Sequence, residues 1–388
     1  MNNPIKLASD PVSKDDIDSL CEWLKQDPTP QLSKGKLTKQ YENEWAAFVG
    51  RKHSCFVNSG STANYLMFRI LEATNRLGNK KVVVPNLCWI TSISPVIQLG
   101  LTPILCDINL RDLSVDLNEL EKTFSKEKPS IFLLVTILGL VPDMGKIVEL
   151  CSKYGVLLLI DNCESSGSKY KGRYIEDFGL MCSTSNYVGH QFVAIEGGMI
   201  CTDDEQCYEM AMFLRSHGWD RDVSPETQKQ LRKQYNVSKF QQLYSFYHPA
   251  YNFRSTEINA FLGIRSLLKA PLMVIKRNKV FNMYIKYIDP SFWKPEINES
   301  SFVCALGYPL ISEKRDEIAE ALRGNNVECR PLVSGAMNTQ PFYLQRYDGC
   351  SMPVSERLND EGMYLPVHPN LSEEDVKFIC EIVNRFSK

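Results

Sequence analysis

Short apolar runs alternate with longer amphipathic stretches between residues 53 and 200. This alternation is typical of βαβ units, so it predicts a mostly parallel sheet with helices between its strands. Residues 131–135 and 156–160 are continuously apolar, which indicates strands that are covered on both faces. The predicted strands are 55–58, 81–85, 102–107, 130–135 and 156–161.

Helical spacing of apolar residues fills the gaps between these strands and marks both ends of the chain. One helix is predicted after residue 60, with Ser61 or Thr62 as its cap. Two others are predicted after Ser13 and Ser372, each with an aspartate three residues on. The apolar positions of the three helices are Ala63, Leu66, Met67, Ile70 and Leu71; Ile17, Leu20, Cys21 and Leu24; and Val376, Ile379, Cys380 and Val383.

The pattern changes after Pro271, where a long basic amphipathic stretch is followed by mixed strand-like and helical segments. We therefore predict an α/β protein with a large domain at 1–270 and a smaller α+β domain at 271–388. The N-terminal helix is a candidate to pack on the smaller domain.

Composition narrows the possible partners of this 388-residue chain. Its formal net charge of -2 provides no field to gather nucleic acid or an anionic membrane surface. The first 25 residues lack the basic and apolar segments of a signal peptide, so we expect a cytoplasmic protein without a membrane partner. Thirteen cysteines occur without a C-x-x-C pair, which favours small core residues over a structural metal site.

Residues 59–64, Ser-Gly-Ser-Thr-Ala-Asn, lie between a predicted strand and a predicted helix. Gly60 permits close approach of the backbone, while free amides and hydroxyls at a helix start can bind an anion. The simpler interpretation is a capped helix without a ligand.

Two other loops follow predicted strands. Asp161 ends one strand, where a side chain of a parallel sheet faces the crevice that binds ligands. Alternatively, Asp161 caps the following turn, and Glu164 is a surface acid. Trp89 follows another strand, where it is either a core aromatic or a ring that faces a ligand.

The segment Ser183 to His190, followed by Glu196-Gly197-Gly198, resembles the cofactor-anchoring segment of the fold-type I sugar aminotransferases. In that family the His190 position is a lysine that binds pyridoxal phosphate covalently. An imidazole has no primary amine to condense with the aldehyde. Further segments carry the resemblance, and they are 59–64, 161–165, 178–181, 216–219 and 328–331.

The resemblance covers nearly the whole chain and implies an aspartate-aminotransferase-like fold. Within the family, the chain is similar to the GDP-4-keto-6-deoxymannose 3-dehydratases. It implies that Asp161 pairs with the ring nitrogen of non-covalently bound pyridoxal or pyridoxamine phosphate and that His190 is the catalytic acid and base. The other implied cofactor-binding residues are Gly60, Ser61, Trp89, Glu164, Ser185 and, from a neighbouring subunit, Asn252. The implied substrate-binding residues are His217, Arg221, Arg254 and Arg330.

The expected activity is removal of the C3 hydroxyl from a nucleotide-linked 4-keto-6-deoxyhexose, with L-glutamate regenerating the cofactor in a homodimer with shared active sites. Some similar dehydratases hold an iron–sulfur cluster on closely spaced cysteines. Here only Cys201 and Cys207 follow His190 nearby, so no cluster is expected. Two alternatives stay open: a dehydratase acting on another nucleotide sugar, such as a CDP-linked one, and a catalytically silent binding subunit.

Overall fold

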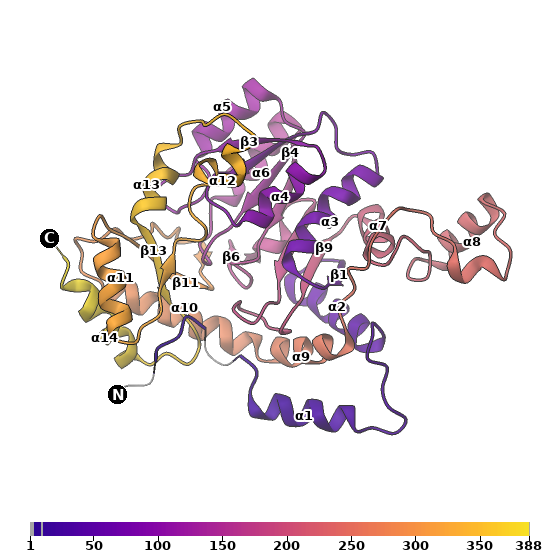
Figure 1. Ribbon diagram of the computed structural model, residues 1–388, viewed down its shortest axis with the longest axis horizontal. Coiled ribbons are helices and arrows are strands. Elements are labelled where there is room, and N and C mark those ends of the chain that lie inside the picture. The colour runs from indigo at the N-terminus through magenta and orange to yellow at the C-terminus, as the bar shows by residue number, and fades with distance from the viewer. Residues whose placement is uncertain (1–3, 9–10, 388) are drawn as a thin grey trace.

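A seven-stranded sheet forms the centre of the computed structural model, which describes residues 4–8 and 11–387 (Figure 1). Strands β1, β2, β3, β4, β5 and β8 run in one direction, and β9 runs against them between β1 and β8. In spatial order the strands are β1 (His53–Val57), β9 (Gly198–Thr202), β8 (Met181–Ser185), β5 (Leu157–Asp161), β4 (Ile131–Val135), β2 (Lys81–Pro85) and β3 (Thr102–Cys106).

Helices cover both faces of this sheet, which explains its continuous apolar strands. The helices on one face are α3 (Gly60–Ala73), α4 (Ile90–Gln98) and α7 (Glu205–Arg215). Those on the other face are α2 (Lys36–Val49), α5 (Leu117–Glu127) and α6 (Met144–Tyr154). This mixed α/β arrangement confirms the predicted fold class. The cap of α3 is Ser59, whose hydroxyl accepts from the Thr62 amide at 3.1 Å, so the predicted caps Ser61 and Thr62 were wrong.

The C-terminal region begins where the chain bends by 65° between α9 (Glu257–Leu268) and α10 (Ala270–Tyr287). Its three-stranded sheet places β13 (Gly362–Pro366) between β11 (Gly307–Ile311) and β12 (Arg330–Pro331). The other helices of this region are α11 (Arg315–Gly324), α12 (Pro341–Leu344), α13 (Pro353–Glu361) and α14 (Glu373–Asn384). The predicted inward face of α14 is confirmed, because Val376, Ile379, Cys380 and Val383 are all buried.

A second small sheet joins the two parts of the chain. It consists of β10 (Ser301–Phe302), β6 (Lys169–Tyr170) and β7 (Arg173–Tyr174). The remaining short helices are 3₁₀ turns, η1 (Ile175–Asp177), η2 (Gln241–Tyr244) and η3 (Met337–Thr339). The division of the chain at residue 270 stays a prediction.

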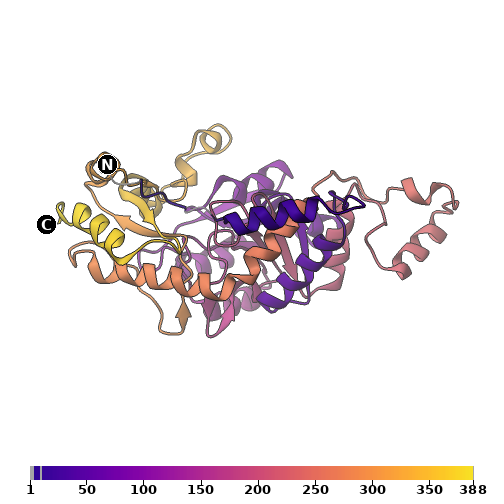
Figure 2. The same cartoon turned by 90° about the horizontal axis from the view of Figure 1, so that it is seen from below.

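The N-terminal helix α1 (Lys14–Leu24) lies on α9 (Figure 2). Asp16 Oδ1 accepts a hydrogen bond from Arg265 Nε at 2.7 Å, and the Trp23 ring stacks on the Phe261 ring. Only half of the predicted apolar stripe is covered: Leu20 and Leu24 are partly buried, whereas Ile17 is 44% exposed and Cys21 is also exposed. Ion pairs and one aromatic contact contribute to holding this helix, which is why the hydrophobic pattern located its packed face only in part.

An arm at residues 224–247 projects from the body at the end opposite the C-terminal region (Figures 1 and 2). It contains α8 (Pro225–Gln234), which has no buried residue. Its exposed large side chains are Tyr235, Phe240, Leu243, Tyr244 and Phe246. In the part of the chain that the structure describes, no single helix is long and apolar enough to cross a membrane; α9 and α10 meet that test only as a bent pair.

Candidate active site

A cavity of about 560 Å³ opens at the edge of the sheet where β1, β2, β4, β5 and β8 end. Because the carboxyl ends of parallel strands share one edge, their loops converge on this cavity. Seven predicted site residues from these loops line it, together with Arg330 from β12: Gly60, Ser61, Trp89, Asp161, Glu164, Ser185 and His190.

The turn before α3 is shaped for a close contact. A Cβ atom added to Gly60 would lie 2.9 Å from both Cys163 Sγ and Ser185 Cβ, so only glycine fits. Ser61 and Ser185 line the cavity beside this helix start. The hydroxyls and the helix amides together form a cradle that suits a phosphate group.

Asp161 is buried at the end of β5 and is oriented by two side-chain donors. Its Oδ2 accepts from Asn64 Nδ2 at 2.6 Å and from Ser92 Oγ at 2.7 Å. Its Oδ1 accepts only a 3.2 Å bond from the Cys163 amide, which leaves room for a further donor in the cavity. Trp89, 52% exposed, lies at the start of α4, one helical turn before Ser92.

Asn64 and Ser92 were not identified from the sequence as site residues. Asn64 is polar on the buried face of α3, and this single polar position in an apolar stripe is the signal that pointed to it. Ser92 carries no comparable signal, because serine is common in the first turn of a helix.

His190 lies in a loop that runs between β8 and β9, and its position is fixed by the backbone. Its amide donates to the Tyr187 carbonyl at 3.0 Å, and the buried Arg277 reaches its carbonyl at 3.4 Å. The adjacent Gln191 donates to the Glu164 carbonyl at 2.6 Å. Burial, reinforced by the Arg277 charge, lowers the pKa of His190 to about 4, so the imidazole is neutral at pH 7.

Glu164 lines the same cavity, and its pKa is shifted in the opposite direction to that of His190. Burial raises the pKa of its carboxyl to about 7, against a bond from the Leu138 amide to Oε2 at 3.1 Å, and the nearby Asp161 adds to the rise. One cavity thus contains a neutral imidazole and a carboxyl group that titrates near neutrality. Such pairs of displaced pKa values are typical of sites that move protons.

Backbone strain also gathers around the cavity. Leu138, Ile195 and Val333 have left-handed backbones with φ of 51°, 68° and 51°. Each conformation costs about 1–2 kcal/mol for a residue with a side chain, so the surrounding packing must hold it. Leu138 donates its amide to Glu164, and Ile195 precedes Glu196, which lines the cavity. Val333 lines the cavity itself, as does Arg330.

Four predicted residues do not line this cavity. Asn252 accepts from Arg254 Nε at 3.0 Å and lies on the surface. The other three, His217, Arg221 and Arg254, lie around the Trp219 ring. We call this group the Trp219 cluster; its members are His217, Trp219, Arg221, Tyr244, Phe246 and Arg254. The Arg221 guanidinium lies 3.8 Å from the Trp219 ring centroid. The cluster therefore joins the segment that enters the arm, at Trp219, to the segment that leaves it, at Phe246.

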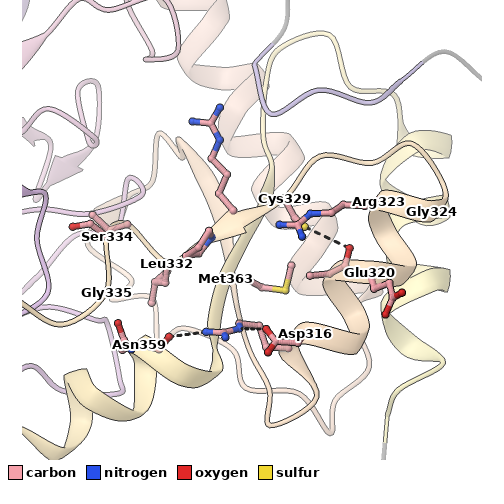
Figure 3. A pocket seen from close by; sticks show the side chains of 15 residues that line it. Asp316, Glu320, Arg323, Gly324, Cys329, Leu332, Ser334, Gly335, Asn359 and Met363 are labelled. Carbon is pink, nitrogen blue, oxygen red and sulfur yellow. Dashed lines mark hydrogen bonds and ion pairs between the residues drawn. The ribbon is translucent and has the colours of Figure 1, made fainter. Parts of the chain in front are cut away.

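A second hollow, of about 850 Å³, lies against α11 and β12 and shares Arg330 and Val333 with the central cavity (Figure 3). The guanidinium of Arg315, which lines this hollow, pairs with Asp316 Oδ1 at 2.8 Å and donates to the Asn359 carbonyl at 2.6 Å. No buried acid or base lines it comparable to His190 or Asp161. The central cavity is therefore the candidate site.

The thiols of the chain form no disulfide, although Cys182 and Cys201 are paired positions on β8 and β9. Cys201 is in β9 and Cys207 in α7, and burial raises the pKa of Cys207 to about 12. All thirteen cysteines are free; among them only Cys21 and Cys350 are exposed. Within residues 4–8 and 11–387, no three His, Cys, Asp or Glu side chains are placed to hold a metal ion.

Comparison with known proteins agrees with this geometry. The model of the DegT/DnrJ/EryC1/StrS aminotransferase family matches residues 13–384. The GDP-4-keto-6-deoxy-D-mannose 3-dehydratase of Yersinia pseudotuberculosis is 31% identical over 90% of this chain and 91% of its own. A solved structure of the E. coli GDP-4-keto-6-deoxy-D-mannose-3-dehydratase with bound hydrated PLP has a TM-score of 0.88 at 26% identity, covering 98% of this chain and 99% of that one.

Another solved GDP-4-keto-6-deoxymannose-3-dehydratase holds a trapped PLP-glutamate geminal diamine. It has a TM-score of 0.86 at 26% identity and covers 98% of this chain and 100% of that one. Both the fold and the matched length thus agree with those of known enzymes. The chain belongs to the DegT/DnrJ/EryC1/StrS aminotransferase family.

Proposed function

We propose that this chain is a pyridoxamine phosphate-dependent 3-dehydratase that removes the C3 hydroxyl of a nucleotide-linked 4-keto-6-deoxyhexose. GDP-4-keto-6-deoxymannose is the substrate that the names of the similar proteins favour. The observation that carries the proposal is His190, a neutral imidazole in the cavity at the position where family members hold lysine.

The residues present fit the cofactor. The Gly60 turn leaves no room for a side chain, as expected where a phosphate approaches the backbone. Asp161 is oriented by Asn64 and Ser92 and keeps acceptor capacity for a protonated ring nitrogen. Trp89 presents an exposed ring to the cavity. When bound, pyridoxamine phosphate supplies the amine that condenses with the C4 ketone and a ring that withdraws electrons from it.

His190 then provides the proton transfers. Neutral at pH 7, the imidazole is able to take up a proton inside the cavity. Once protonated it is a strong acid, because burial favours its neutral form, and it is able to deliver the proton to the oxygen leaving C3. Without a lysine at this position the chain cannot hold the cofactor covalently there, and this favours loss of water over amino transfer.

We further propose that two copies share their sites, with Asn252 and the Trp219 cluster serving the partner's cavity. The support is that these residues lie outside the cavity of their own chain, mostly at the base of the arm, whose large aromatic rings are exposed. The regenerating donor is glutamate, as the glutamate adduct of a similar protein suggests. A cytoplasmic location remains part of the proposal.

Product analysis tests the activity. Purified protein is incubated with pyridoxamine phosphate, glutamate and GDP-4-keto-6-deoxymannose, and in parallel with a CDP-linked 4-keto sugar. We expect a GDP-linked product lighter by one oxygen atom, together with ammonia and 2-oxoglutarate, by mass spectrometry. An aminated sugar as sole product would contradict the proposal. Absence of a cofactor absorption band would instead favour a silent binding subunit.

A further inference from the structure

Residues 4–8, the N-terminal strap, form one wall of the cavity. Ile5 pairs with Val327 in a parallel bridge, since its amide donates to the Asn326 carbonyl and its carbonyl accepts from the Glu328 amide, both at 2.9 Å. The Leu7 amide donates to Glu328 Oε2 at 3.0 Å. The strap is thereby fixed to the segment that leads directly into β12.

This attachment places one lysine at the cavity. Lys6 and Arg330 are the two lysine or arginine residues that line it, among the residues that the structure describes. Both side chains are exposed, and neither has a carboxylate oxygen within 4.0 Å in that part of the chain. Positive charge without an internal partner at a cavity is available to an anionic ligand.

The two cations lie on a different wall from the phosphate cradle. Lys6 and Arg330 belong to the strap and to β12, whereas Gly60 and Ser61 belong to the start of α3. Arg330 lies beside Tyr364, which itself lines the cavity near Glu164. A cofactor phosphate in the cradle therefore leaves both cations free for the other reactant.

We propose that Lys6, held by the strap, binds an oxyanion of a reactant jointly with Arg330. The inference rests on the proposed function and names the anion as the diphosphate of the nucleotide sugar or a carboxylate of glutamate. Lys6 is a binding residue, and Glu328 is a positioning residue that acts through the Leu7 amide.

Substitution of Lys6 tests the binding role. For Lys6→Met we expect the KM of one reactant to rise about 10-fold, as for loss of one charge-assisted contact, while kcat stays within about 2-fold. Lys6→Arg should recover most of the loss. Lys14→Met, which changes an exposed lysine of α1 paired only with Asp18, is the matched control and should leave both constants unchanged.

The affected reactant identifies the anion. A higher KM for the nucleotide sugar, with weaker binding of GDP by calorimetry, assigns the diphosphate, whereas a higher KM for glutamate assigns the carboxylate. Unchanged constants for both reactants and unchanged GDP affinity overturn the proposal. So does irreversible labelling of Lys6 after borohydride treatment of the holoenzyme, since that would make Lys6 a covalent cofactor ligand.

The strap itself is tested at Glu328. Glu328→Ala removes the acceptor of the Leu7 amide, so we expect faster hydrogen exchange at Leu7 and a KM change in the same direction as for Lys6→Met. Glu328→Gln retains an acceptor oxygen and should preserve both. Faster exchange without any change in KM overturns the positioning role. If the wild type makes no deoxygenated sugar, the proposed function fails, while the GDP and glutamate titrations still decide the role of Lys6.

Discussion

The cofactor side of the cavity and the arm are built by opposite means. Around Asp161 and Gly60, side chains are buried, hydrogen-bonded and closely packed within one chain. On the arm, α8 has no buried residue, and Phe240 is 93% exposed. One region is packed and hydrogen-bonded within its own chain, while the other presents exposed contact surface. Under the proposed function, the chemistry is specified within one chain, and a second copy would contribute to recognition of the substrate.

The largest expected effect lies in the buried region. Replacing His190 with asparagine removes the group that accepts and donates protons, so kcat should fall by about 10²- to 10⁴-fold. Cofactor binding, followed by absorbance, should persist, because Asp161 and the Gly60 turn are untouched. His53→Asn, at a histidine outside the cavity that pairs with Glu205, should retain activity. Retention of activity by His190→Asn would remove the basis of the proposed chemistry.

A smaller loss is expected at the Trp219 cluster, at the base of the arm. The double change Arg221→Ala with Arg254→Ala removes both cations of the Trp219 cluster and should lower kcat/KM roughly 10- to 100-fold. Lys229→Ala, on the exposed surface of α8, is the matched control and should have no effect.

Mixing the two defective proteins sharpens the comparison. If the sites are shared, a mixed dimer of His190→Asn and the double arm variant contains one intact site. Random reassociation should then restore about a quarter of wild-type activity, since half of the dimers are mixed and each has one working site. No recovery beyond the sum of the separate proteins would show that each chain works with its own arm.

The smallest effect concerns the pH dependence of stability at Glu164. Its folded pKa, about 7, lies above the ordinary value of 4.5, so the folded state binds a proton that the unfolded state has released between these values. This contribution to stability is complete below about pH 4.5 and is lost as the pH rises through 7. Glu164→Gln should therefore gain about 1–2 kcal/mol relative to wild type between pH 5 and 8 in denaturant titrations.

Glu176 provides the control for this measurement. Burial raises the pKa of its carboxyl to about 7 as well, but it does not line the cavity. Glu176→Gln should show the same trend in stability while leaving the pH profile of kcat unchanged, whereas Glu164→Gln should alter that profile near pH 7. Identical activity profiles for the two variants would exclude a role for Glu164 in the reaction.

The central sheet could be predicted because its strands are continuously apolar. Strand β2 has the predicted bounds, and β3, β4 and β5 differ by a single residue. Helix α2 was not predicted, because its buried face includes Thr38 and Glu42. The polar contacts of Glu42, with the Phe56 amide at 2.9 Å and with Arg215, are tertiary and leave no periodic apolar signal.

The site residues also divide into those that the sequence predicts and those that it does not. Gly60, Asp161 and His190 follow strand ends or match a family motif, so their convergence could be expected. Lys6 could not be found, because it reaches the cavity only through a bridge between Ile5 and Val327, which are far apart in the sequence. No local pattern encodes such a pairing. His217, Arg221 and Arg254 were predicted to bind the substrate, but the structure of one chain places them outside its own cavity.

The distribution of the thiols has a practical consequence. Cys21 on α1 and Cys350, next to α13, are the exposed pair, and the other cysteines are buried or partly covered. Burial also suppresses thiolate formation in the core, as the raised pKa of Cys151, about 12, illustrates. Maleimide dyes should therefore attach at two points, one on α1 and one next to α13. Energy transfer between these dyes would report the distance between α1 and the segment next to α13 in the native, unmutated enzyme, with and without substrate.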